Sequence, residues 1–194
     1  MKKLLCAMVA ACAACGFAQE AVPVNEAVPV LVGLFDPVQT APSTVDVHGF
    51  ELGILWDGSM NVRGISLAGG GNLAYGDLIG AQAALGFNWN EKGGFGVMGA
   101  LGFNRAGGDF GGAQWSYGAN ICRGDFYGFQ DSCSNYANVM HGVQLGLVNM
   151  SHDCRGLQVG VINTAEKMSG IQVGILNFIK ESPLPFFPIV NAHF

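Results

Sequence analysis

Charged residues are scarce in this chain of 194 residues. There are nine Lys or Arg and 14 Asp or Glu, together 12% of the sequence, whereas a soluble domain carries about 25%. So few basic residues exclude a protein that binds nucleic acid through a positively charged surface. Because half of the residues are hydrophobic, the chain is also too apolar to be intrinsically disordered.

Long hydrophobic runs are missing after residue 18, so the sequence predicts no transmembrane helix there. The apolar run Leu4–Cys15 follows a short basic start and is shorter than the roughly 20 residues of a bilayer-spanning helix. Residues 1–18 are therefore predicted to be a secretory signal peptide that is cleaved after Ala18. The alternative is a lipoprotein, because residues 9–12 resemble a lipobox and would leave a lipidated Cys12 at the N-terminus.

Sequence motifs for catalysis are missing as well. There is no nucleophile elbow, phosphate-binding loop or zinc-binding helix, and cysteines and histidines lack metal-ligand spacing. The only polar cluster expected inside strands is His48, Glu51 and Arg63. A barrel enzyme would use such a cluster for acid–base chemistry, but we interpret it as a Glu–Arg pair that braces the interior. The sequence therefore predicts no enzyme, no cofactor and no metal.

Three cysteines follow the predicted signal peptide. Cys122 and Cys133 bracket a short segment, and in an exported protein we expect them to form a disulfide. The alternative pairing joins Cys133 to Cys154. Residues 123–125 read Arg-Gly-Asp, an integrin-type adhesion tripeptide that we interpret as a chance match in a glycine-rich loop.

Glycine, by contrast, is abundant, with 30 residues, and it recurs regularly. The step is 16 residues from Gly64 to Gly128 and 14 residues from there to Gly170, and asparagines recur every 16 residues from Asn72 to Asn120. Such regularity identifies a repeat protein. The last three units read GVQLGLVN, GLQVGVIN and GIQVGILN. Their repeat positions are Gly142, Gln144, Gly146, Asn149, Gly156, Gln158, Gly160, Asn163, Gly170, Gln172, Gly174 and Asn177.

Within each unit, side chains alternate between two types, which predicts β-strands. In residues 79–88, for example, Ile79 and Leu85 face one side, and Gln82 and Asn88 face the other. Most charged residues fall in turn-rich clusters between the strands, and residues 57–59 are predicted to form one such turn. Because recurring glycines indicate closely approaching backbones, we expect a crowded, uncharged interior of Gly, Gln and Asn.

Two all-β architectures fit this pattern. The favoured one is an antiparallel meander β-barrel of about ten strands over residues 45–194, preceded by a Pro-rich extended lead-in over residues 19–44. Uncharged bands between charged turns suit a barrel in a membrane. Phe194, at the end of an alternating strand, resembles the C-terminal signal for barrel insertion. The alternative is a β-solenoid, in which each unit is one coil and Gln and Asn stack in ladders.

The chain resembles a family of bacterial surface-repeat proteins. The resemblance rests on the three C-terminal units, the segment Leu34–Gln39 and the closing segment Leu184–Pro188, and it extends over residues 31–194. The units at residues 64–140 depart from the pattern because their step is 16 and two of them lack the glutamine. The resemblance implies a surface or outer-membrane location and brings no catalytic or binding residue.

These observations predict an outer-membrane or surface-exposed β-barrel with a structural or surface-interaction role. Its expected partners are the lipid bilayer of the outer membrane and the barrel-insertion machinery, and no nucleic acid. The alternative is an exported β-solenoid that serves as an adhesin or structural surface protein. A narrow channel or an enzyme inside a barrel is the least favoured prediction.

Overall fold

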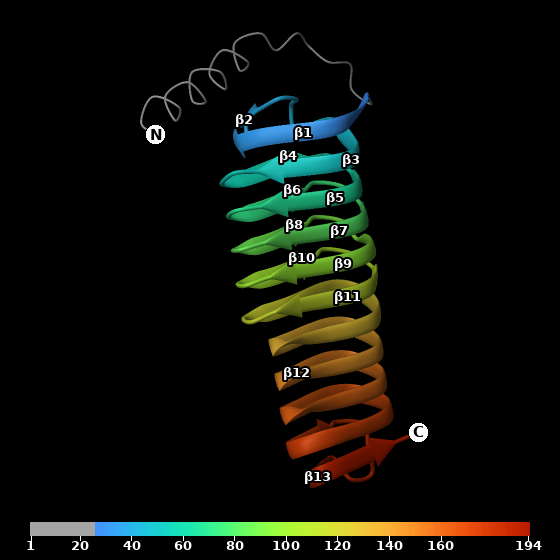
Figure 1. Cartoon of the computed structure of the whole chain (residues 1–194). Coiled ribbons are helices and arrows are strands. Elements are labelled where there is room, and N and C mark those ends of the chain that lie inside the picture. The colour runs from blue at the N-terminus through green and yellow to red at the C-terminus, as the bar shows by residue number, and fades with distance from the viewer. Residues whose placement is uncertain (1–25) are drawn as a thin grey trace.

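The computed structural model describes residues 26–194, so the predicted signal peptide, its cleavage after Ala18 and Cys12 lie outside the described residues. Residues 26–194 contain no helix, and so none that could span a membrane. The strands stack into a column, with β1 near one end and β13 at the other (Figure 1). The strands are β1 (Ala27–Phe35), β2 (Val38–Gln39), β3 (Asp46–Gly53), β4 (Trp56–Ser59), β5 (Val62–Ala68), β6 (Gly71–Ala74), β7 (Leu78–Ala84), β8 (Phe87–Asn90), β9 (Gly94–Ala100), β10 (Phe103–Ala106), β11 (Phe110–Ser116), β12 (Ala119–Ile179) and β13 (Phe186–His193).

Each repeat unit forms one coil with two strand segments. The first segments stack in the order β3-β5-β7-β9-β11 and continue into β12, and the second segments stack in the order β4-β6-β8-β10 and also continue into β12. All these pairings are parallel, and equivalent residues of successive units lie side by side. Gly64 pairs with Gly80 and Asn72 pairs with Asn88. The 16-residue step is therefore the length of one coil.

The predicted antiparallel barrel is wrong, and the alternative, a β-solenoid, is the fold. A meander reverses direction at every strand, whereas successive coils here run in the same direction. Antiparallel pairs join only β1 to β2 and β12 to β13 among the described strands. The all-β class and the repeat-built body are confirmed.

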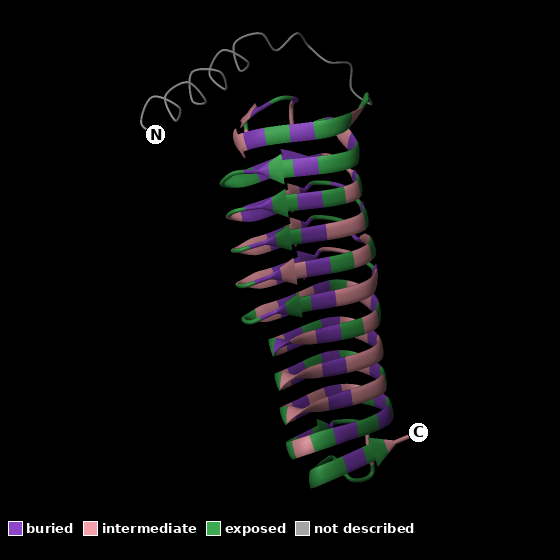
Figure 2. Ribbon diagram, in the orientation of Figure 1, coloured by how far each residue is buried: buried purple, intermediate pink, exposed green. Residues whose placement is uncertain are grey.

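The predicted alternation of side chains is confirmed. Gln82 and Asn88 are buried inside the coil, while Ile79 and Leu85 are exposed on its outer surface. Figure 2 shows the same alternation of buried and exposed positions along the stacked strands. The interior is not made of Gly, Gln and Asn alone, because it also holds a hydrophobic core that includes Phe110, Phe126 and Met98. Many other large apolar side chains point outward.

The recurring glycines mark a place where backbones of successive coils nearly touch. Gly80 has a φ of 141°, which residues with a Cβ rarely adopt. A Cβ at this position would also collide with the carbonyl oxygen of Gly64 in the preceding coil. The same arrangement repeats at Gly142, Gly156 and Gly170, so the expected crowding is present.

The two ends of the column have different caps. β1 lies parallel to β3, and Leu31 is buried together with Ala41, Val45 and Val47. The lead-in predicted over residues 19–44 thus contributes a strand to the first coil. At the other end β13 pairs antiparallel with β12, and Phe194 follows it with 86% of its surface exposed. Phe194 therefore follows a strand that caps the solenoid and does not end a strand of a barrel.

Candidate functional site

The interior holds a continuous ladder of asparagine side chains. Each Nδ2 donates to Oδ1 of the asparagine in the next coil, and a second bond from the same Nδ2 goes to a backbone carbonyl. The Nδ2–Oδ1 distances lie between 2.6 and 3.1 Å. All members are fully buried. The ladder consists of Asn72, Asn88, Asn104, Asn120, Asn135, Asn149, Asn163 and Asn177.

A second ladder of glutamines runs beside the first with the opposite polarity. From Gln130 onward each Nε2 donates to Oε1 of the glutamine in the preceding coil, at 2.8 to 2.9 Å. The amide donors therefore point toward the N-terminal end in this ladder and toward the C-terminal end in the asparagine ladder. The members are Gln114, Gln130, Gln144, Gln158 and Gln172.

The predicted repeat residues thus have structural roles in the interior. Gln144, Gln158 and Gln172 belong to one ladder, and the asparagines of the last three units belong to the other. A Cβ at Gly146 or Gly160 would collide with a ladder asparagine and with a backbone carbonyl of the preceding coil. Gly174 lies in the same position in the last coil.

Two acidic residues are buried in the N-terminal coils, and one of them continues the line of the asparagine ladder. Asp57 occupies the asparagine position one coil before Asn72. Glu51 lies in register with Ser66, which lies in register with Gln82. Met98 separates Gln82 from Gln114, where the glutamine ladder begins. Asp57 and Glu51 are fully buried. Ser59 Oγ donates to Glu51 Oε2 at 3.2 Å, while Glu51 Oε1 and both carboxylate oxygens of Asp57 have no hydrogen-bond partner.

Burial favours the neutral form of both acids. Desolvation raises the pKa of Glu51 from 4.5 to about 7, and the hydrogen bond from Ser59 opposes this rise. Desolvation, followed by the nearby charge of Glu51, raises the pKa of Asp57 from 3.8 to about 8. Asn72 donates with its Nδ2 to the following coil, so its acceptor Oδ1 faces the coil of Asp57. A protonated Asp57, which can donate, therefore suits this position better than a carboxylate.

The predicted polar cluster of His48, Glu51 and Arg63 is not formed. His48 and Arg63 are neighbours in register on the outer surface, whereas Glu51 points inward. The predicted pair of Glu51 and Arg63 is therefore wrong. Arg63 lies beside His48 on the outer side, whereas Glu51 comes three positions after His48 and so faces the opposite side of the strand. The buried neighbour of Glu51 is Asp57, which was missed because residues 57–59 were predicted to be a turn and instead belong to β4.

The three cysteines that follow the predicted signal peptide are free thiols. Cys122 and Cys154 point into the interior and Cys133 lies on the outer surface, so the predicted bond between Cys122 and Cys133 is not formed in this structure. Burial raises the pKa of the Cys122 thiol to about 11 and that of Cys154 to about 12. Residues 123–125 form part of a coil, where the backbone N–H of Asp125 donates to Asp109 Oδ1.

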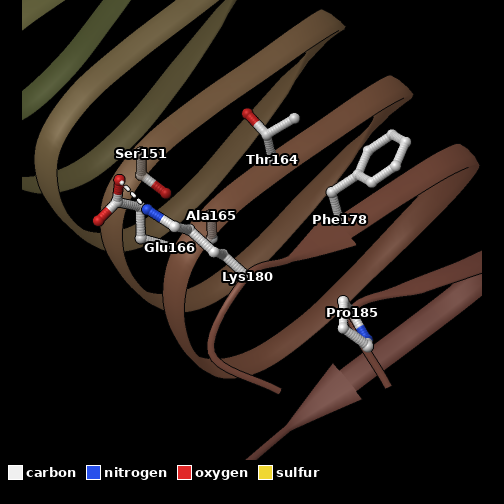
Figure 3. A pocket seen from close by; sticks show the side chains of 7 residues that line it. All are labelled: Ser151, Thr164, Ala165, Glu166, Phe178, Lys180 and Pro185. Carbon is white, nitrogen blue, oxygen red and sulfur yellow. Dashed lines mark hydrogen bonds and ion pairs between the residues drawn. The ribbon is translucent and has the colours of Figure 1, made fainter. Parts of the chain in front are cut away.

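A pocket of about 400 Å³ lies on the outer surface beside the C-terminal cap. Figure 3 shows Glu166 and Lys180 pointing toward one another, with Phe178 and Pro185 on the other side. Lys180 Nζ lies 3.2 Å from Glu166 Oε1, and His152 Nδ1 lies 3.0 Å from Glu166 Oε2. Because its charged groups already contact one another, the pocket offers an apolar wall rather than an unpaired charge to a ligand.

No cluster of three or more His, Cys, Asp or Glu side chains that could hold a metal ion occurs in residues 26–194. No family model, no curated protein and no solved structure matches the chain. Function must therefore be inferred from the architecture and the surface.

Proposed function

We propose that this protein is an exported β-solenoid that serves as a structural or surface-interaction protein at the cell surface. The observation that carries the proposal is the contrast between its interior and its exterior. The interior is closed by hydrogen-bonded amide ladders and a hydrophobic core, and yet further large apolar side chains such as Ile65, Leu85 and Phe95 are exposed. Binding energy is therefore available on the outer faces.

The repeat architecture suits such a role. Each coil contacts its neighbours through parallel backbone pairing and through the ladders, so the column is a rigid, one-dimensional stack. Elongated stacks of this kind present extended binding surfaces. The signal-like segment before Ala18 supports export.

Protease treatment of intact cells tests the location. An epitope attached after Phe194, which is exposed, should be removed from intact cells by added protease, while a periplasmic marker protein stays whole. Mass spectrometry of the mature N-terminus should find a chain that begins at Gln19. An epitope that is cut only after lysis would contradict a surface location, and a lipidated N-terminus at Cys12 would replace simple cleavage by a lipoprotein anchor.

A further inference from the structure

One face of the solenoid is apolar along nearly its whole length. It is the outer side of the sheet formed by β3, β5, β7, β9, β11 and the matching segments of β12, and we call it the broad face. Two rows of outward positions run along it in register. The first row is Phe50, Ile65, Ala81, Val97, Ala113 and Phe129, and the second is Leu52, Leu67, Ala83, Gly99, Trp115 and Asp131. The 14-residue step extends the rows to Ile171 and Val173.

The broad face is exposed and carries few charges. Ile65 is 49% exposed and Val97 53%, and Asp131 is the only charged residue in the two rows. A third outward row lies beside them at the start of the strands. It adds the exposed side chains of Ile79, Phe95 and Tyr127, and its charges are Arg63 and, by the 14-residue step, Arg155. The adjoining corner adds further exposed apolar residues, among them Leu85 and Leu101. Other charges, among them Asp77, Glu91 and Asp109, lie in the turns that follow β6, β8 and β10, at the other corner of the coils.

The size of the broad face indicates what kind of partner it can bind. Eight steps of about 4.8 Å between strands give a length of about 40 Å, and four to five residues along each strand give a width of about 16 Å. The resulting area of about 650 Å² exceeds the few hundred Å² of a usual apolar patch on a monomer. It approaches the roughly 800 Å² that each partner contributes to a stable protein–protein interface.

We propose that the broad face is the interface with a second copy of this chain, packed sheet against sheet. The inference deepens the proposed interaction role and rests on it. The sheet has no register shifts from β3 to β12, and Figure 1 shows its strands stacked with little twist. Flat sheets of many strands are usually stabilised by stacking or by side-chain ladders. Here the ladders stabilise the inner side, and a second flat sheet fits the outer side.

Charge favours a second copy over an anionic bilayer. Residues 26–194 contain seven Lys or Arg and 13 Asp or Glu, so an anionic lipid surface would repel them. In a face-to-face pair the charged edges lie at the rim, where water screens them. Asp131 lies in the wall of an open hollow of about 280 Å³, together with Trp115, Tyr117 and Leu147. The hollow keeps this carboxylate accessible to water and provides space for an apolar side chain of the partner.

Sedimentation equilibrium of the full exported chain, purified without denaturant, tests the proposal. The wild type should be a dimer at micromolar concentration. Val97→Lys and Ile65→Lys each place a charge inside the broad face and should raise the dimer dissociation constant at least ~30-fold. Far-UV circular dichroism should remain unchanged, because both side chains point outward. The matched control is Met150→Lys, which changes an outward residue with 39% exposure on the other sheet and should leave the dimer intact.

Several results would overturn the proposal. A wild type that stays monomeric contradicts it, as does equal weakening by Val97→Lys and Met150→Lys. Loss of the dimer in Ile189→Lys would instead place the contact at the C-terminal cap, where this side chain is 73% exposed. A monomer that floats with phosphatidylcholine vesicles, and no longer does so with Val97→Lys, would assign the face to a bilayer. A monomer on the cell surface contradicts only this inference, whereas a dimer that protease cannot reach on intact cells contradicts only the proposed location.

Discussion

Replacing the buried carboxylate of Asp57 by an amide should stabilise the protein and remove much of the pH dependence of its stability. Asp57 is fully buried, and neither of its oxygens has a hydrogen-bond partner. In Asp57→Asn the new Nδ2 lies where it can donate to Asn72 Oδ1, which extends the asparagine ladder by one coil.

The sign of the pH effect follows from the raised pKa. Between about pH 4 and pH 8 the native state keeps a proton on Asp57 that the unfolded chain releases, so the wild-type free energy of unfolding should fall as pH rises through this range. The pKa shift from 3.8 to about 8, at about 1.4 kcal/mol per unit, sets an upper limit of about 6 kcal/mol. Because relaxation and water entry reduce such penalties, we expect Asp57→Asn to gain about 3 kcal/mol at pH 8 and little at pH 4.

Urea denaturation followed by circular dichroism from pH 4 to pH 8.5 measures this effect. Glu51 should contribute a smaller decline in the same direction, since its pKa is raised to about 7, and this decline should persist in Asp57→Asn. The control is Glu181→Gln, which changes an exposed carboxylate and should follow the wild-type curve. A wild type whose stability does not fall between pH 5 and pH 8, or an Asp57→Asn variant that is less stable at pH 8, would refute the reasoning.

Three further predictions concern the interior. Gln144→Met removes both ladder bonds of a buried amide and should lower the free energy of unfolding by about 3 kcal/mol in a urea titration. Gln82→Met removes a buried amide that has no partner, so this variant should raise the free energy of unfolding in the same titration. Gly128→Ala places a Cβ against a backbone carbonyl at a φ of 140° and should lower the free energy of unfolding by more than about 3 kcal/mol. A Cβ at Gly99 meets nothing within 4 Å, so Gly99→Ala should leave the melting temperature unchanged. Maleimide labelling with peptide mapping should modify Cys133 in the native state and the two buried thiols only in urea; rapid native labelling of those two would contradict their burial.

Strand periodicity and the inward position of the glutamines and asparagines were predictable from the sequence, because alternation along a strand decides which side each residue faces. The hydrophobic core beside the ladders, with Phe110 and Phe126, was not predicted. The architecture was predicted wrongly because an even repeat length is compatible with both folds. In a barrel and in a solenoid alike, equivalent residues of successive units then face the same side. One signal favoured the solenoid. Identical residues such as Gly64 and Gly80 meet side by side only if successive units run parallel, since a meander would reverse every second unit.

The acidic residue at the end of the asparagine ladder was harder to predict. Asp57 lies 15 residues before Asn72, off the 16-residue step, and its Gly-Ser neighbours suggested a turn. Asn135 was missed for the same reason, because it also lies 15 residues after Asn120 and joins the ladder all the same. If the repeat unit is allowed to be one residue shorter in the turn between two strands, both positions align with the ladder.

Spin-label distances along the column test the solenoid most directly. One label replaces Leu73, and the second replaces in turn Tyr136, Met150, Thr164 or Phe178, which occupy the matching outward position of successive coils. Labelled chains are diluted with unlabelled protein. Pulsed electron paramagnetic resonance should give distances that rise by about 4.8 Å per coil, from about 19 to about 34 Å. Distances that rise and then fall, as strands around a closed barrel would give, would contradict the solenoid.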